Sequence, residues 1–262
     1  MPTDPTPAER HPHPLRHLWA DRIDPHSYLG LHLIVSLAGI SLLLWVFGSL
    51  LDAVLDNKLV VRWDVAIDLA IHEHMTPPSL RVVDWVTQLG SPVAMGVLGL
   101  VVAVVLWRQQ HRTACWGWIA AFVGGAALAQ LVKTLVHRTR PVYGAAYLHG
   151  HSFSFPSGHA TGSMIGYVML AWLVRHVWHA GVVQRRLAVV AAALVILAIG
   201  VTRILLGVHY PSDVMGGWAV GAAWTWVCIT AVGTAEYRRM LRAHPVGAAE
   251  LERAQVDSSA RK

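Results

Sequence analysis

Residues 187–206 read LAVVAAALVILAIGVTRILL, twenty residues in which Arg203 is the only charged side chain. A helical run of about 18 or more apolar residues is long enough to cross a hydrocarbon core about 30 Å thick. A strand of a membrane barrel needs only about 10 residues, and backbone in lipid must satisfy its own hydrogen bonds. This stretch therefore predicts a transmembrane helix.

The rest of the chain repeats this pattern. Apolar runs between charged or proline-containing breaks give six expected spans, at residues 29–51, 86–107, 114–136, 159–179, 187–206 and 213–234. The composition agrees, because 55% of the 262 residues are hydrophobic and 14% are charged, whereas a soluble domain carries about 25% charged residues. We expect an all-α integral membrane protein built as a bundle of six transmembrane helices.

The distribution of Lys and Arg predicts how the bundle is oriented. Fourteen of the 21 basic residues fall in the two tails and in the second and fourth loops, and positively charged loops stay cytoplasmic. We expect a cytoplasmic N-terminal tail at 1–28, a six-span domain at 29–236 and a cytoplasmic C-terminal tail at 237–262. The N-terminal tail has no short apolar run with a small-residue cleavage site, so no removable signal peptide is expected.

The first outer loop, residues 52–85, is too long to be a bare connector. It holds three basic and six acidic residues. Within it, the apolar triplets at 65–67 (VAI) and 69–71 (LAI) favour a short amphipathic helix on the outer surface. An ordinary loop outside the membrane is the alternative.

Composition and spacing also exclude two kinds of partner. The net charge is +6, but no basic stripe with interleaved aromatic residues is present, so we expect no nucleic acid. The two cysteines have no metal-ligand spacing, and no Cys or carboxylate cluster completes a zinc site with the His-x-His pairs. We therefore expect no metal and no other cofactor. These residues are Cys115 and Cys228, and the pairs His11 and His13, His72 and His74, and His149 and His151.

The first of three polar clusters ends the third expected span, where residues 133–141 read KTLVHRTRP. Lys133 and Arg140 are seven residues apart, about two helical turns, and point the same way if the helix continues that far. Pro141 is expected to end the helix. Taken alone, these cations are explained more simply as side chains that reach out to the membrane interface.

The second cluster, FPSGH at residues 155–159, directly precedes the fourth span. Its Pro-Ser-Gly sequence predicts a turn into a helix, with Ser157 as the cap. The amides of Gly158 and His159 and the Ser157 hydroxyl would then suit an anion such as phosphate. His159 can give or take a proton near neutral pH. A capped helix start without further function is the alternative.

The third cluster, TRILLGVHYPSD at residues 202–213, joins the fifth and sixth spans. Pro211 suits a first helical turn, which places Asp213 at the positive end of the sixth helix and near His209. A carboxylate on one imidazole nitrogen fixes the tautomer and leaves the other nitrogen free as a nucleophile. The alternative is a loop histidine beside a capping aspartate.

The expected topology puts all three clusters on the same, outer side. Together they supply three cations, a helix N-terminus, a His–Asp pair and a second histidine. Phosphoryl transfer requires such a set, because the transferred group is stabilised by positive charge and amides while a nucleophile attacks in line and an acid protonates the leaving oxygen.

In these motifs the chain resembles the type 2 phosphatidic acid phosphatase (PAP2) family, whose signatures are K-x6-R-P, P-S-G-H and S-R-x5-H-x3-D. They correspond here, in order, to residues 133–141, 156–159 and 202–213, with Thr202 in place of Ser. The resemblance spans the second to the sixth expected span. It implies a helical core shared with the vanadate haloperoxidases, and a metal-independent phosphatase.

The resemblance also implies a role for each residue. His209 would attack phosphorus and form a phosphohistidine, Asp213 would orient it, and His159 would protonate the leaving group and later activate water. The phosphate would be held by Lys133, Arg140, Ser157, Gly158 and Arg203, and Arg138 is near enough in sequence to assist.

A membrane lipid phosphate is the expected substrate and the bilayer the expected surrounding. Phosphatidic acid, phosphatidylglycerol phosphate and undecaprenyl diphosphate all suit a site at the outer interface. A haloperoxidase is disfavoured by the six spans, because those enzymes are soluble. The remaining alternative is a lipid transporter or scaffold that binds phosphate headgroups without cleaving them.

Overall fold

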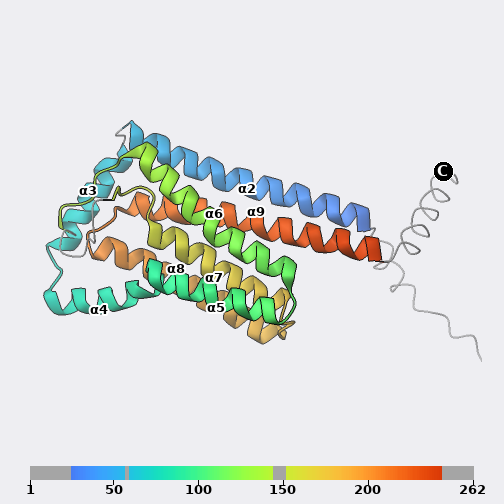
Figure 1. Ribbon diagram of the computed structural model, residues 1–262. Coiled ribbons are helices and arrows are strands. Elements are labelled where there is room, and N and C mark those ends of the chain that lie inside the picture. The colour runs from blue at the N-terminus through green and yellow to red at the C-terminus, as the bar shows by residue number, and fades with distance from the viewer. Residues whose placement is uncertain (1–24, 57–58, 144–151, 244–262) are drawn as a thin grey trace, which may run out of the picture.

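The computed structural model describes residues 25–56, 59–143 and 152–243, and these residues form helices and no strands (Figure 1). The prediction of an all-α protein is confirmed. The elements in chain order are α2 (Pro25–Leu55), α3 (Leu59–His72), α4 (Pro77–Thr87), the 3-10 helix η1 (Gln88–Gly90), α5 (Pro92–Arg108), α6 (Arg112–Val136), α7 (Gly158–His176), α8 (Val182–Leu205) and α9 (Pro211–Ala243).

Five helical stretches among the described residues are long and apolar enough to cross a membrane. They coincide with five of the expected spans and comprise Leu33–Leu55, Pro78–Arg108, Arg112–Val136, Val182–Leu205 and Pro211–Arg239. The expected fourth span corresponds to α7, a 19-residue helix that does not belong to this apolar set. It carries buried polar residues such as Thr161 and Ser163, so the count of six spans stays a prediction.

The helix α7 is at the centre of the bundle and packs against α5, α6, α8 and α9, while α2 lies along α9 on one side (Figure 1). Fully buried side chains including Trp118, Leu106 and Met169 fill the space between α5, α6 and α7. The indole of Trp118 donates to the Gly99 carbonyl at 2.8 Å. The polar atom of this buried ring is therefore satisfied.

The start of α7 lies close against α9 because α9 carries glycine there. A Cβ atom at Gly217 would lie 2.8 Å from the Ser157 carbonyl oxygen, and one at Gly221 would lie 3.0 Å from the Thr161 carbonyl oxygen. These distances leave no room for a side chain. The small residues let the polar start of α7 meet the polar start of α9.

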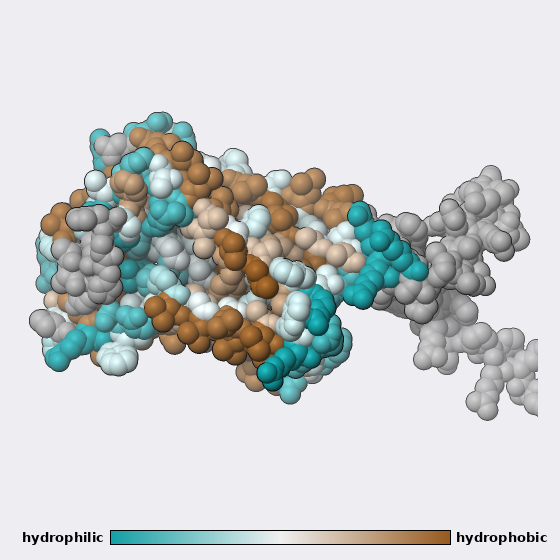
Figure 2. All heavy atoms as spheres, viewed as in Figure 1, coloured by the Kyte–Doolittle hydropathy of each residue, from teal (hydrophilic) through white to brown (hydrophobic). Residues whose placement is uncertain are grey.

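Apolar side chains cover the outside of the helices, and polar residues gather at both ends (Figure 2). Exposed examples are Leu37 on α2, Val93 on α5, Leu135 on α6 and Leu187 on α8. The described starts of α2 and ends of α9 lie at one end of the bundle, and α3 and α4 lie at the other (Figure 1). The tails at 1–24 and 244–262 are outside the described residues, and α9 continues past the expected domain end at 236.

The expected short helix in the first outer loop corresponds to α3, and α4 follows it. The orientation of α3 is unusual, because its acidic residues Asp64 and Asp68 are buried, at 2% and 5% exposure, whereas Trp63 is 62% exposed. The helix therefore turns its carboxylates toward the protein and its apolar side chains outward. The reason is a set of polar partners at the same end of the bundle, described below.

Candidate active site

A cavity of about 560 Å³ opens between α5, α6 and α7 and reaches the loop between α8 and α9. Its lining combines polar and apolar residues. The polar lining includes Lys133, Arg140, Gly158, His159, Arg203 and His209, and the apolar lining includes Pro92, Met95, Phe122, Ala129 and Ile165. Six of the eight site residues expected from sequence thus line one cavity, and Asp213 and Ser157 lie just behind it.

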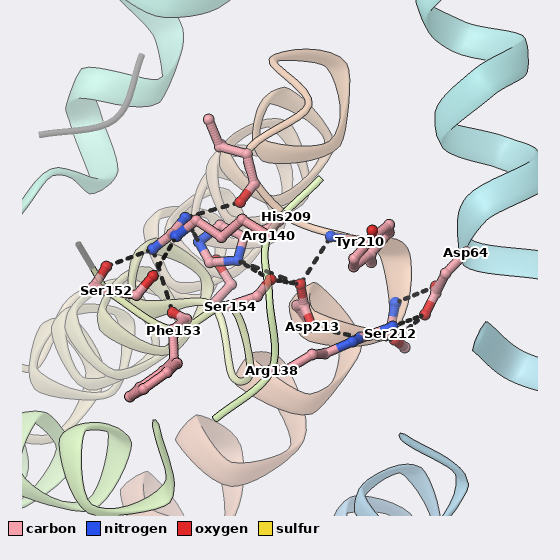
Figure 3. A network of polar contacts seen from close by, with 12 residues as sticks. Asp64, Arg138, Arg140, Ser152, Phe153, Ser154, His209, Tyr210, Ser212 and Asp213 are labelled. Atoms are coloured by element: carbon pink, nitrogen blue, oxygen red, sulfur yellow. Dashed lines mark hydrogen bonds and ion pairs between the residues drawn. The ribbon is translucent and has the colours of Figure 1, made fainter. Parts of the chain in front are cut away.

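His209 lies in the loop between α8 and α9 and is 2% exposed. Its Nδ1 is 3.5 Å from Asp213 Oδ2, and its Nε2 is 3.2 Å from Arg140 Nη1 (Figure 3). A guanidinium only donates hydrogen bonds, so Nε2 accepts and the ring proton is on Nδ1. This tautomer leaves a lone pair on Nε2, the ring nitrogen that faces Arg140 in the cavity lining.

Burial lowers the pKa of His209 to about 3. Asp213 opposes this shift, and the cations Arg140 and Arg203 add to it. The imidazole is therefore neutral at physiological pH. A neutral imidazole is the form that acts as a nucleophile.

Asp213 is fully buried in the first turn of α9. Its Oδ2 accepts hydrogen bonds from the Tyr210 amide at 2.8 Å and from the Ser154 hydroxyl, and its Oδ1 accepts one from Arg138 Nη1 at 2.6 Å. Asp213 is the third residue of α9. An acidic side chain at this position commonly accepts a hydrogen bond from the backbone amide of the residue that precedes the helix, here Tyr210. These donors hold the carboxylate in place beside His209.

Ser154 belongs to this group although sequence reasoning did not identify it. Its Oγ is 3.4 Å from His209 Nδ1 and donates to Asp213 (Figure 3). It thereby bridges the imidazole and the carboxylate. The only signal in the sequence was its position just before the FPSGH cluster, and serine is common in such turns.

The second histidine, His159, is half-buried in the first turn of α7 and lines the cavity. Helix α7 begins at Gly158, as expected, but Ser157 does not cap it through its side chain. The Ser157 hydroxyl is buried and has no hydrogen-bond partner among the described residues, while its amide donates to the Asp213 carbonyl at 3.0 Å. A free hydroxyl beside a helix N-terminus suits an anion.

The three expected cations are held by uncharged oxygens. Lys133 Nζ donates to the Phe153 carbonyl at 2.7 Å, Arg140 Nη1 to the Val208 carbonyl at 2.8 Å, and Arg203 Nη1 to Thr87 Oγ1 at 3.1 Å. Within the described residues none of them forms an ion pair with a carboxylate, and the Arg203 Nε has no partner. Such unbalanced positive charge in a half-buried site favours an anionic ligand.

Lys133 and Arg140 meet for a reason that differs from the expected one. Helix α6 ends at Val136 because His137 takes a left-handed conformation, with φ 52°. The helix therefore does not continue to Arg140, and Pro141 follows its end by several residues. The chain after His137 folds back, and this fold brings Arg140 to the same cavity as Lys133.

The sequence put Arg138 near enough to assist in holding phosphate without assigning it as a ligand, and the structure gives it other partners. Its guanidinium pairs with Asp213 at 2.6 Å and with Asp64 at 2.8 Å. It is not among the cavity-lining residues. Arg138 thus contacts the carboxylates behind His209 and not the position where a phosphate would be held.

Among the described residues no group of three His, Cys, Asp or Glu side chains is arranged to hold a metal ion. His72 and His74 each direct Nδ1 to a carbonyl one turn earlier in α3, at 2.8 and 2.9 Å. The pairs His11 and His13, and His149 and His151, lie outside the described residues.

The fold and the cavity define a helical membrane protein with a cationic site and a buried His–Asp pair. Residues 114–237 match the profile of the PAP2 superfamily. Phosphatidylglycerophosphatase B of Bacillus subtilis is 30% identical over 181 residues, which cover 68% of this chain and 87% of the relative. Decaprenylphosphoryl-5-phosphoribose phosphatase of Mycobacterium tuberculosis is 29% identical over 170 residues, covering 62% and 86%.

Comparison of structures gives the same result. A crystal structure of a transmembrane PAP2-type phosphatidylglycerolphosphate phosphatase from Bacillus subtilis aligns with a TM-score of 0.66 and 25% identity, covering 72% of this chain and 94% of that one. The chain belongs to the PAP2 superfamily, as its three motifs predicted. It is a multi-pass membrane protein of a family of lipid phosphatases.

Proposed function

We propose that this protein is a membrane lipid phosphatase that cleaves a phosphate monoester or diphosphate through a phosphohistidine on His209. The observation that supports this most strongly is the state of His209. Its Nδ1 faces Asp213 and its Nε2 accepts a hydrogen bond from a cavity-lining arginine. A protein that only bound headgroups would need the cations but not an oriented, neutral imidazole.

In the first step the lone pair of His209 Nε2 attacks phosphorus, and the bond from phosphorus to the lipid oxygen breaks. Lys133, Arg140 and Arg203 balance the charge on the phosphoryl oxygens. The Ser157 hydroxyl and the Gly158 amide add hydrogen bonds. His159, charged beside the phosphate because an anion favours the imidazolium form, gives its proton to the leaving oxygen.

In the second step water attacks the phosphohistidine. His159, now neutral, accepts a proton from this water. The phosphorus–nitrogen bond breaks, His209 recovers its lone pair, and inorganic phosphate leaves. Asp213 stabilises the Nδ1–H of His209 in both steps. The cations of the chain itself supply the positive charge, so we propose a metal-independent reaction.

The apolar part of the cavity lining supports a lipid as the substrate. Met95, Phe122 and Ile165 lie beside the polar part, so one molecule can place its phosphate among the cations and its tail along α5, α6 and α7. Phosphatidic acid, phosphatidylglycerol phosphate and undecaprenyl diphosphate remain the candidates. The similarity to phosphatidylglycerophosphatase B makes phosphatidylglycerol phosphate the first to test.

We also propose that residues 29–236 form the phosphatase domain in the plasma membrane, with both tails cytoplasmic and the site on the outer side. The positions of the bundle ends support this orientation. The start of α2 and the end of α9 lie together, opposite the end that carries α3 and the site (Figure 1). The Lys and Arg distribution puts those two tails in the cytoplasm.

The test is phosphate release by the full-length protein in detergent with EDTA, on each of the three lipids. We expect release by the wild type, none by His209→Ala, and unchanged release by the control His74→Ala, which alters an exposed histidine at the same end of the bundle. Acid-labile, base-stable phosphate on the protein should be trapped at short times and be absent in His209→Ala. Binding of lipid without release would support the transporter or scaffold instead.

A further inference from the structure

The helix α3 carries a carboxylate that the three motifs do not include. Asp64 is 2% exposed and faces the start of α9, 148 residues away in sequence. Its Oδ1 accepts a hydrogen bond from the Ser212 amide at 3.0 Å. Its Oδ2 accepts one from the Ser212 hydroxyl and one from Arg138 Nη2 at 2.8 Å (Figure 3). Both oxygens of this buried group are therefore satisfied from outside its own helix.

Arg138 connects Asp64 to the His–Asp pair. One arm of its guanidinium, Nη2, binds Asp64, and the other, Nη1, binds Asp213 Oδ1 at 2.6 Å and Ser212 Oγ at 2.8 Å (Figure 3). A guanidinium is planar and its donors have fixed directions. Two carboxylates held by its two arms therefore set each other's position.

The two oxygens of Asp213 have different partners, and this affects His209. Arg138 binds Oδ1 of Asp213, and Oδ2 is the oxygen that faces His209 Nδ1. Asp64 holds the second arm of the Arg138 guanidinium. Without Asp64, that arm would be free to turn toward Oδ2 of Asp213, the oxygen that faces His209. Asp64 also fixes the Ser212 amide in the first turn of α9, directly before Asp213.

The other end of α3 is attached to the same region. His72 stacks on Tyr143, with ring centroids 4.6 Å apart and an angle of 7°. Gly207, at the beginning of the loop that carries His209, has φ 61°, and a Cβ atom there would lie 2.5 Å from His72 Nε2. The helix α3 therefore lies against the 207–213 segment at two points, Asp64 near its middle and His72 at its C-terminal end.

We propose that Asp64 is a positioning residue for the reaction, acting on His209 through Arg138, Ser212 and Asp213. This inference rests on the proposed phosphatase function. It explains why α3 directs its carboxylates into the protein and leaves Trp63 exposed. The outer segment then contributes Asp64, the carboxylate that positions the nucleophile through Arg138 and Asp213.

The test substitutes Asp64→Asn, which keeps the shape and removes the charge. In metal sites, mutating a partner that orients a metal ligand lowers metal affinity or activity about 10- to 100-fold. We expect a fall of that order in kcat and in the rate of phosphohistidine formation. KM should change less than about threefold, because the cavity-lining cations are untouched. The control is Glu73→Gln, which removes the charge of an exposed carboxylate just past the end of α3, at the same end of the bundle.

A double-mutant cycle with Arg138→Lys shows whether Asp64 acts through Arg138. If it does, the double variant is about as slow as the worse single variant, whereas independent effects multiply. Thermal unfolding of each variant separates a positioning role from loss of the fold. Should Asp64→Asn not fold, Ser212→Ala removes one contact of the same carboxylate, and its kcat should still fall with KM unchanged.

The outcomes distinguish this inference from the proposed function. A wild type that releases no phosphate from any lipid overturns both. A wild type that is active while Asp64→Asn matches it, or while the control Glu73→Gln is slowed equally, overturns the positioning role and leaves the phosphatase function standing. The positioning role is also overturned if the losses in kcat of Asp64→Asn and Arg138→Lys multiply in the double variant.

Discussion

Replacing Asp213 by asparagine tests the state of His209 most directly. The carboxylate accepts from Arg138 on one oxygen and from Tyr210 and Ser154 on the other, the oxygen that faces His209 Nδ1. An asparagine has one acceptor oxygen and one NH₂ group that only donates. Whichever way the amide lies, at least one of these buried donors loses its acceptor.

The two orientations have different costs. With NH₂ toward Arg138, a buried cation loses one partner, which costs about 1–3 kcal/mol or more because the group is charged. With NH₂ toward His209, Nδ1 must accept, so the ring proton moves to Nε2 and the nucleophilic lone pair is lost. The equivalent change in a serine protease triad lowers kcat about 10⁴-fold for the same reason. We expect a loss of about 10³- to 10⁴-fold, or about 4–5 kcal/mol in the barrier.

The assay is single-turnover formation of the phosphohistidine on the lipid that the wild type prefers. The control is Ser163→Ala, which removes another buried polar group, one that bonds within α7 and is not part of the cavity lining. We expect the control to react at nearly the wild-type rate. A rate for Asp213→Asn within tenfold of wild type, in folded protein, would refute the role of the Asp213 carboxylate in stabilising His209.

Three further predictions concern stability, phosphate binding and packing. Burial lowers the pKa of His209 to about 3, from about 6.5 in the unfolded chain. Between these two pH values the unfolded chain binds a proton on His209 and the folded protein does not, so the free energy of unfolding falls as the pH drops below about 6.5. The wild type should thus lose about 2 kcal/mol more than His209→Gln between pH 7.5 and pH 5, measured by thermal unfolding in detergent; equal losses would contradict it. Thr87→Val removes the acceptor of Arg203, so inhibition by vanadate should weaken several-fold, and an unchanged inhibition constant would count against this contact. Gly217→Ala should lower the rate of phosphate release at least tenfold, because the new Cβ meets backbone at 2.8 Å, while Gly233→Ala, which has open space, should be neutral; similar rates would contradict the close packing.

Much of the fold was predictable because the membrane imposes one simple requirement. A backbone in lipid must bond to itself, so an apolar run of sufficient length is a helix whatever its neighbours are. Five of the expected spans accordingly coincide with long apolar helices. The fourth was less clear, because α7 is surrounded by other helices and can carry buried polar residues such as Thr161 and Ser163.

The candidate site was predictable in its members but not in its contacts. The motifs named three cations, two histidines, Asp213, Ser157 and Gly158, and six of these eight residues line one cavity. Ser154, Asp64 and Thr87 were missed because nothing in their local sequence distinguishes them from other polar residues. Their partners lie 59, 148 and 116 residues away.

The amino-acid sequence alone thus determined that this chain is a helical membrane protein and which side chains to propose for phosphoryl transfer, since both depend on local composition and spacing. The tertiary structure decided which atom meets which. It sets the tautomer of His209 through Arg140 and Asp213, leaves the cavity cations without carboxylate partners among the described residues, and turns the acidic face of α3 inward. Hydrogen bonds act only over about 3 Å, so they depend on how distant helices pack against one another.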